Sequence, residues 1–329
     1  APGVDLLGAQ TREVANGLRG ERYQYLSGTS MAVPEVAGVA ALLRQAHPQW
    51  SPAALRSALM TTARQDLVRS DGSSADPFDF GAGQIVPDLA ADPGLVYETS
   101  RDDYDAFGCG IGLATIDADR CAALADAGYS LAATDLNLPS IASHGLVHSR
   151  SIRRRVTNVG PAAVYQATVE APPGTTVAVP PTSLALASGE SAEYTLTITS
   201  TGAARRADYF SAEAALPDFR FGAITWRDAR HVVRSPLAVA PAAIGVEDPV
   251  AGHEASGNTT IHVDFGYDGP YQALASGLAT PAIYSGNIID DPLDYYGFLA
   301  DDSALPDFIR RQRIEVPPGT RYLRVALAG

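Results

Sequence analysis

A run of small apolar residues most constrains the first hundred residues of the chain. Residues 36–43, VAGVAALL, place apolar side chains on every side of the helix that they predict. A helix of this kind lies inside the core of a sizeable domain. Gly38 and the alanines would let neighbouring backbones approach closely, and the helix should end before Pro48. We expect this helical part to pack on something that the chain does not contain.

A second helix is predicted immediately downstream, in the segment SPAALRSALMTTAR. Ser51 is the expected N-cap and Pro52 occupies the first helical position, a place that proline favours. Leu55 and Leu59 would share one apolar face. The segment before these helices, APGVDLLGA at residues 1–9, resembles a strand that leads into a turn.

After about residue 137 the hydrophobic period changes from that of helices to that of strands. Apolar residues alternate with polar ones in two segments, Tyr165, Ala167 and Val169 in one and Tyr194, Leu196 and Ile198 in the other. Short alternating strands with no helical pattern between them predict a β-sandwich. The segment 221–239, FGAITWRDARHVVRSPLAV, would supply its last strands.

A second all-β stretch is expected from about residue 245. Its alternating positions are Ile261, Val263 and Phe265, and later Leu323, Val325 and Leu327. The chain stops at Gly329 directly after a predicted strand. We therefore expect this last domain to be cut short.

Charge and hydropathy exclude two classes of partner. The net charge is −13 and every basic residue is an arginine, so the chain is a poor candidate for binding nucleic acid, which requires a positive surface. The run Arg153-Arg154-Arg155 is interpreted as a solvated strand face. The sequence has no uninterrupted apolar stretch of about 18 residues, so no membrane-spanning helix is predicted. The first residues lack the features of a signal peptide, as if the chain began inside a domain.

Two cysteines, Cys109 and Cys121, lie in a polar stretch rich in glycine and aspartate. Their spacing fits neither a Cys-x-x-Cys redox motif nor a four-ligand zinc site. A disulfide here would stabilise the fold by roughly 3 kcal/mol and would favour an oxidising compartment. Two free thiols are the alternative.

Ser30 is the candidate nucleophile. It follows Gly28 and Thr29 at the start of the apolar helix, where the helix dipole and free backbone amides favour a developing oxyanion. Gly28 would permit close approach of a substrate. Taken alone, the tripeptide favours a simple turn and N-cap over a nucleophile.

The longer segment SGTSMAVPEVAGVAALL resembles the nucleophile segment of the subtilisin-like serine proteases, the subtilases. The matching positions are Gly28, Thr29, Ser30, Met31, Ala32, Pro34, Val36, Ala37 and Gly38. Glu35 stands where the family usually has a histidine that is not the catalytic base.

The resemblance extends on both sides of this segment. Before it, APGVDLLGA at residues 1–9 resembles the family strand that leads toward the serine. HPQWSPAALRSALMTTA and FGAGQIVPDLAADPGLVYE resemble later parts of the catalytic domain, and DLNLPSI, RRRVTNVG and residues 221–239 resemble the fibronectin-III-like domain of plant-type subtilases. Asp228-Ala229 replaces the usual Asp-Gly, so a looser hairpin turn is expected. The final residues are weakly similar to jelly-roll extensions of secreted bacterial proteases.

The resemblance implies a multidomain chain, with a partial α/β subtilisin-like catalytic domain followed by all-β sandwich domains. The expected parts are a catalytic segment at 1–98, a linker with the disulfide at 99–136, a fibronectin-III-like sandwich at 137–241 and a partial jelly-roll-like domain at 242–329. It also implies a secreted protein, of expected bacterial source. Calcium is common in the family, but no metal site or other cofactor can be assigned here.

By the same resemblance, Ser30 would attack a protein or peptide substrate, with its backbone N–H directed at the oxyanion and Gly28 and Thr29 beside the substrate. The family's aspartate, histidine and oxyanion asparagine precede the serine, in the order Asp, His, Ser. Only 29 residues precede Ser30 and none is a histidine. Asp5 and Asn16 lie in the wrong context to replace the missing residues.

Downstream histidines are no substitute for the base. His47 would lie about 25 Å away along the helix, at ~1.5 Å per residue. The remaining histidines fall in predicted linker or sandwich segments, and they are His144, His148, His231, His253 and His262. We therefore expect the isolated chain to be inactive and to require the N-terminal part of the catalytic domain as its partner.

Two other functions compete with this interpretation. The chain could be a non-catalytic binding or interaction module derived from a subtilase. An esterase-type hydrolase would need a Gly-x-Ser-x-Gly motif around the serine, which the residues flanking Ser30 do not supply.

Overall fold

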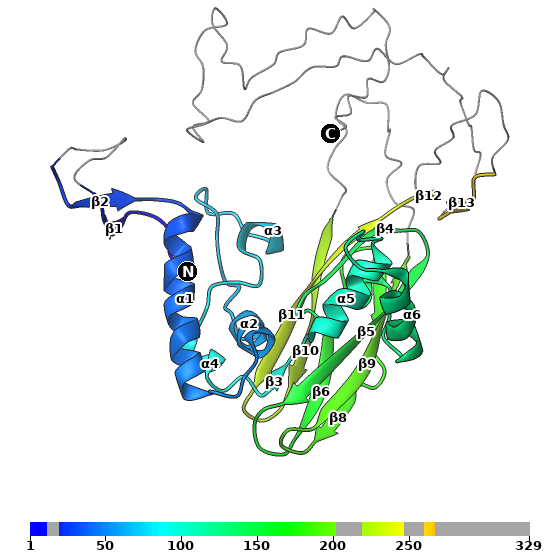
Figure 1. Cartoon of the computed structure of the whole chain (residues 1–329). Helices are drawn as coiled ribbons and strands as arrows, with labels where there is room; N and C mark the ends of the chain where they lie inside the picture. Colours follow the sequence, from blue (N-terminus) through cyan, green and yellow to red (C-terminus); the bar gives the residue numbers. More distant parts are fainter. Residues whose placement is uncertain (12–19, 202–218, 247–259, 267–329) are drawn as a thin grey trace, which may run out of the picture. The chain divides into compact units, whose positions relative to one another are not determined.

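The computed structural model describes residues 1–11, 20–201, 219–246 and 260–266 (Figure 1). The later alternating positions at 323–327, together with most of the expected jelly-roll-like domain, lie outside these residues. The described part before residue 91 contains one β-hairpin and four helices. The elements are β1 (Leu6–Ala9), β2 (Tyr23–Leu26), α1 (Thr29–Ala46), α2 (Pro52–Thr61), α3 (Pro77–Phe80) and α4 (Pro87–Ala90).

Both predicted helices are confirmed, and their ends follow the expected signals. Helix α1 ends at Ala46, before Pro48. Helix α2 begins at Pro52, and the Ser51 hydroxyl accepts a 3.0 Å hydrogen bond from the Ala54 amide as its N-cap. The predicted first strand is also present, as β1 paired antiparallel with β2.

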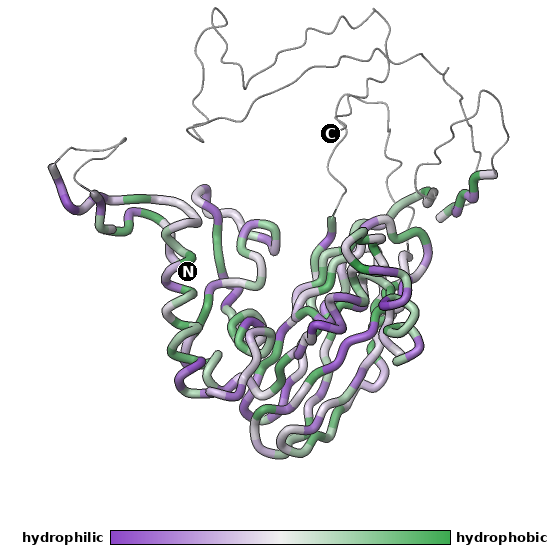
Figure 2. The backbone as a smooth tube through the Cα atoms, viewed as in Figure 1, coloured by the Kyte–Doolittle hydropathy of each residue, from purple (hydrophilic) through white to green (hydrophobic). Residues whose placement is uncertain are grey.

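The burial expected for α1 is not found among the described residues. Leu43 is its one buried side chain, and it packs with Leu59 of α2 and Ala90 of α4. The side chains of Val33 and Leu42 are 63% and 64% exposed. Figure 2 shows α1 coloured mainly white to green along its length, although little covers it. Helix α1 therefore has the composition of a core helix, but the described residues bury only one of its side chains.

A β-sandwich follows, as the strand period predicts. One sheet has the order β4-β11-β10-β6-β8, and the other has the order β3-β5-β9-β7. The strands are β3 (Leu95–Val96), β4 (Ile141–Leu146), β5 (Ser149–Asn158), β6 (Ala163–Glu170), β7 (Thr175–Ala178), β8 (Ser183–Leu186), β9 (Ser191–Ser200), β10 (Arg220–Arg227) and β11 (Val232–Pro241).

The residues expected to face inward form the sandwich core. Tyr165 of β6 and Tyr194, Leu196 and Ile198 of β9 are buried between the sheets, together with Trp226 of β10. The Tyr97 and Tyr194 hydroxyls lie 2.8 Å apart, and the Ser235 hydroxyl donates a 3.0 Å hydrogen bond to that of Tyr97. Burial raises the pKa of both tyrosines. Both phenol groups therefore stay protonated, and each hydroxyl is a hydrogen-bond partner for the other inside the core.

The predicted solvated arginine face is wrong at one of its three positions. Arg154 on β5 is 4% exposed, and its guanidinium donates hydrogen bonds to backbone carbonyls of Thr134, Leu138, Ser140 and its own neighbour Arg153. The strand alternation turns position 154 inward, in phase with the buried Ile152 and Val156.

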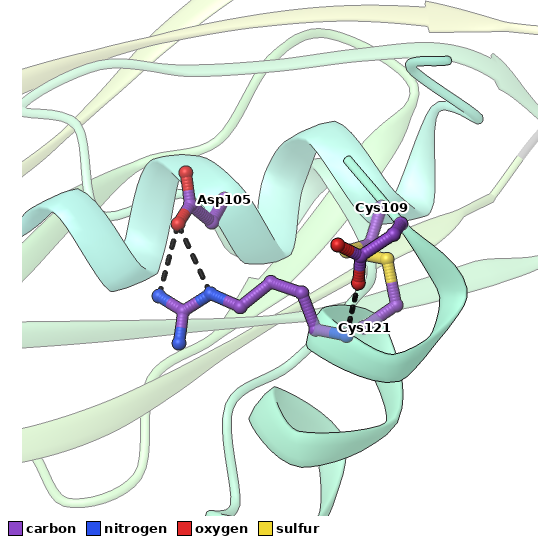
Figure 3. The surroundings of a disulfide bond; sticks show 5 residues. Asp105, Cys109 and Cys121 are labelled. Atoms are coloured by element: carbon purple, nitrogen blue, oxygen red, sulfur yellow. Dashed lines mark hydrogen bonds and ion pairs between the residues drawn. A yellow bond between two sulfur atoms is a disulfide. The ribbon is translucent and has the colours of Figure 1, made fainter. Parts of the chain in front are cut away.

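The segment 99–136 contains two helices rather than a loop. They are α5 (Arg101–Gly110) and α6 (Ala118–Asp126), followed by the short 3-10 helix η1 (Ala133–Asp135). The predicted disulfide is confirmed, because Cys109 of α5 is bonded to Cys121 of α6 (Figure 3). Asp105, one turn before Cys109, accepts hydrogen bonds from the guanidinium of Arg120, the residue before Cys121. The two helices are thus joined by a covalent bond and an adjacent ion pair.

Asp135, the last residue of η1, and Asn137 cover the stretch of β5 that lies beyond its two-residue pairing with β3. The Asp135 carboxylate accepts a 2.9 Å hydrogen bond from the Arg153 amide. The Asn137 side chain accepts a 2.8 Å bond from the Arg155 amide and donates a 2.8 Å bond to the Arg155 carbonyl. These side chains therefore take the positions that a neighbouring strand's backbone would otherwise fill.

Two short strands lie beyond the sandwich, β12 (Ile244–Val246) and β13 (Val263–Phe265), and they pair antiparallel.

The replacement of glycine by Ala229 predicted a loose turn between β10 and β11, but the structure shows an ordered one. Asp228 Oδ1 accepts hydrogen bonds from the amides of Arg230 and His231, at 2.7 and 2.5 Å. The aspartate side chain thus orders the turn.

Candidate active site

Ser30 occupies the first turn of α1, with its side chain exposed. Gly28 is the N-cap residue, and no side chain caps this end of the helix. The first amides of an α-helix have no acceptor within the helix. The Ser30 hydroxyl and the amides around it therefore face an open surface, where the helix dipole favours negative charge.

Two contacts hold the turn that carries Ser30. The Gly28 amide donates a 2.7 Å hydrogen bond to the Gly3 carbonyl, and the Met31 amide donates a 3.0 Å bond back to the Gly28 carbonyl. A side chain at Gly3 would lie only 2.8 Å from the Gly28 carbonyl oxygen. The first residues of the chain thus fit directly beneath the turn.

A second pair of contacts lies one residue earlier. The Asp5 amide donates a 2.9 Å hydrogen bond to the Ser27 hydroxyl, which in turn lies 3.3 Å from Asp5 Oδ1. Asp5 adopts a left-handed backbone conformation, with φ 52°, which is uncommon for a residue other than glycine. Asp5 therefore contributes to the geometry of the turn before Ser30.

Pro34 lies inside α1 and removes one more backbone donor near the serine. The Ser30 carbonyl would ordinarily accept a hydrogen bond from residue 34, but proline has no N–H. Glu35 is exposed on the same helix. Its side chain forms no hydrogen bond or ion pair in the described part of the chain, so nothing there assigns it a role.

The described histidines do not come together with Ser30. His47 follows the far end of α1, where its Nε2 lies 2.9 Å from the Ala91 carbonyl oxygen and its ring stacks on Trp50. His144 belongs to β4 and His231 to the β10–β11 hairpin. His148 lies between β4 and β5, and His262 directly precedes β13. His253 lies outside the described residues. The structure thus positions the candidate nucleophile and brings no described histidine to it.

Neither a metal centre nor a membrane span is found in the described ranges. No group of three or more His, Cys, Asp or Glu side chains in these residues could hold a metal ion. No described helix is long and apolar enough to cross a membrane.

Comparison with known proteins identifies the two parts of the chain. Residues 1–83 match the model of the subtilase family, and residues 135–239 match a fibronectin type-III domain. The chain is 38% identical over 262 residues to the CO(2)-response secreted protease of Arabidopsis thaliana. The first part of the chain is thus similar to the subtilases.

Other subtilases show the same pattern of similarity. The chain is 41% identical over 263 residues to the subtilisin-like protease SBT1.6 of Arabidopsis thaliana and 36% identical over 261 residues to the subtilisin-like protease Glyma18g48580 of Glycine max. Each alignment covers 73% of this chain and between 31% and 33% of the relative. The chain thus spans about a third of the length of the curated relatives that it matches.

Proposed function

We propose that the chain is part of a serine endopeptidase in which Ser30 attacks the carbonyl of a peptide bond and forms an acyl-enzyme. The observation that carries this proposal is the exposed Ser30 at the uncapped start of α1, within the part of the chain that matches the subtilase family. Its own backbone N–H would donate to the oxyanion, and Gly28 and Thr29 would lie beside the substrate.

The base and the second oxyanion donor would come from protein outside this chain. The histidines with described positions lie at the far end of α1 or beyond residue 140, and a nucleophilic serine needs a base within hydrogen-bond reach. We infer that the isolated chain does not hydrolyse peptides. Loss of triad members leaves only residual catalysis.

The exposed apolar side chains of the helical part indicate where the rest of a catalytic domain would pack. On α1 they are Val33 and Leu42, and on the adjoining hairpin they are Leu7, Tyr23 and Tyr25. Large apolar side chains left this exposed on one helix and the hairpin before it are candidates for burial against another part of a protein. We infer that these residues contact the remaining part of the catalytic domain.

Secretion is the location that we propose. The Cys109–Cys121 disulfide favours an oxidising compartment, and one relative is named a secreted protease. The expected bacterial source is not supported, because the relatives described above are plant proteins.

A fluorophosphonate probe, which labels activated serines, tests the function. We expect labelling of the longer protein encoded by the same gene and no labelling of its Ser30→Ala variant. Ser73→Ala removes an exposed loop serine, so it serves as the matched control and should label normally. An unlabelled longer protein would contradict the protease assignment and favour the non-catalytic binding module. Strong labelling of the isolated chain would contradict the inference that its base lies elsewhere.

A further inference from the structure

His231 is a buried imidazole with a carboxylate at each ring nitrogen. The residue is 7% exposed. Its Nδ1 lies 2.8 Å from Asp228 Oδ2, and its Nε2 lies 3.2 Å from Asp92 Oδ1. The first contact is a well-formed hydrogen bond. The second is within ion-pair distance, but Nε2 has no aligned hydrogen-bond partner among the described residues.

The two carboxylates belong to different parts of the fold. Asp228 lies in the same β10–β11 turn as His231. Asp92 follows α4. The preceding Ala90 and Ala91 pack with Leu43 of α1 and Leu59 of α2, which together form the helical cluster. The His231 ring therefore bridges the sandwich and the segment attached to the helices.

The backbone of this segment lies directly on the ring. A Cβ at Gly94 would come within 2.9 Å of His231 side-chain carbons and of the Tyr165 hydroxyl. Gly94 has φ +77°, a conformation that favours glycine. The Gly94 carbonyl accepts a 2.9 Å hydrogen bond from the Val159 amide. Residues 92–94 are thus seated between the ring and the sandwich, and the Val159 amide reports whether they stay there.

The protonation state of the ring decides how well both contacts are made. A neutral imidazole has one N–H donor and one lone pair. If its Nδ1 donates to Asp228, the Nε2 lone pair faces the Asp92 carboxylate, which is repulsive. A protonated ring donates from both nitrogens and carries a positive charge between two negative ones, so each hydrogen bond becomes charge-assisted.

Other charged groups complete this environment. The Arg230 guanidinium lies 2.9 Å from Asp92 Oδ2 and keeps that carboxylate paired when the ring is neutral. The Tyr165 ring lies 6.5 Å from His231, and burial together with Asp228 and Asp92 raises the pKa of Tyr165 to about 12. Burial raises the pKa of Asp228, but hydrogen bonds from His231 and two backbone amides outweigh it, and the pKa lies below its ordinary value. The tyrosine is therefore neutral and Asp228 charged wherever a histidine ordinarily titrates.

We propose that Asp92, His231 and Asp228 form a proton-dependent clasp that holds residues 92–94, and the helical cluster attached to them, against the sandwich. The clasp is tightest when both ring nitrogens of His231 carry a proton. It weakens as the pH rises and one of these protons is lost. The clasp lies where the helical part meets the sandwich, and its response to pH does not depend on whether the chain hydrolyses peptides.

Hydrogen exchange of the Val159 amide in the 329-residue chain tests the clasp. We expect its protection factor, which is corrected for the intrinsic effect of pH on exchange, to fall about tenfold between pH 5.5 and 8.5, as for loss of one charge-assisted hydrogen bond. In Asp92→Asn the fall should vanish. Asp66→Asn, which removes a carboxylate from an exposed ion pair with Arg64, is the matched control and should behave like the unmodified chain.

A second variant covers the case in which Asp92→Asn disturbs the junction at every pH. His231→Gln keeps a polar side chain that does not titrate, and its Val159 protection should be independent of pH. ¹⁵N-histidine NMR should show both His231 nitrogens protonated at pH 5.5 and one at pH 8.5. A pH-dependent fall that persists in His231→Gln, or a ring that stays neutral at pH 5.5, would overturn the proposal.

Discussion

The Gly28 amide nitrogen lies 2.7 Å from the Gly3 carbonyl oxygen, and this hydrogen bond joins the first residues of the chain to the turn that carries Ser30. The bond needs close approach of two backbones, because a Cβ on Gly3 would lie 2.8 Å from the Gly28 carbonyl oxygen and 3.3 Å from the Ala32 Cβ. The position of the candidate nucleophile therefore depends on a glycine from which it is separated by the whole β1–β2 hairpin (Leu6–Leu26).

Gly3→Ala should displace this turn. We expect the protection of the Gly28 amide against hydrogen exchange to fall about tenfold, as for loss of one hydrogen bond and the added steric contact. Gly8→Ala is the matched control, because the nearest atom to its Cβ would be Leu26 Cδ1 at 3.9 Å. Unchanged protection in Gly3→Ala would show that the turn does not depend on this contact.

Gly38→Ala should have opposite effects in two contexts. A Cβ at Gly38 meets nothing within 4 Å in the described structure, so alanine should stabilise α1 in the isolated chain by about 0.5–1 kcal/mol. In the longer protein we expect destabilisation, because the proposed covering part packs closely here. Thermal unfolding of both proteins measures the two effects, and stabilisation in both would argue against close packing at Gly38.

Arg154→Met should strongly destabilise the sandwich. Removing the guanidinium leaves several partly buried carbonyls without a donor, and each such group costs about 1–3 kcal/mol where water cannot replace the donor. We expect a loss of at least about 3 kcal/mol in the free energy of unfolding, measured by urea titration with tryptophan fluorescence. Arg153→Met removes a half-exposed ion pair with Asp135 and should cost about 1 kcal/mol or less. Equal losses in the two variants would contradict the role assigned to the buried guanidinium.

The buried tyrosines should make the fold sensitive to alkali. Burial, with help from Asp228 and Asp92, raises the pKa of Tyr165 from 10.0 to about 12. A folded-state pKa above the unfolded one stabilises the fold fully below pH 10 and loses that contribution as the pH rises towards 12. Tyr165→Phe should therefore show a shallower decline in unfolding free energy between pH 9 and about pH 11. An unchanged slope would mean that other groups control the alkaline transition.

The local signals in the sequence predicted most elements of the sandwich and the start of α2. The alternation around Tyr165 and Tyr194 placed both residues in the core, where the structure has them. The Ser51-Pro52 pair marked the helix start to the residue. These features depend on neighbours within a few positions, which a single sequence contains.

The helices α5 and α6 were missed, although their caps were visible. Ser100 and Asp103 form a capping box, and Asp117 caps α6. The glycines and aspartates of this stretch suggested a loop and obscured those caps. Arg154 was missed for a related reason, because three adjacent charges suggested a solvated surface when the phase of β5 turns the middle one inward.

The candidate site was predicted only in its local part. The Gly-Thr-Ser segment at the start of a helix could be identified from sequence, and the structure places Ser30 there. The contacts of Gly28 with Gly3 and of His231 with Asp92 could not, since they join residues far apart in the chain. Such pairs follow from tertiary packing, which no periodicity encodes.

The cover that Asp135 and Asn137 provide for β5 bears on how the protein behaves at high concentration. An uncovered edge strand can recruit a strand from another molecule and start aggregation. Here the side chains of Asp135 and Asn137 already form hydrogen bonds with the backbone groups of Arg153 and Arg155. The segment that leads into the sandwich therefore protects this stretch of β5 from pairing with a strand of another copy.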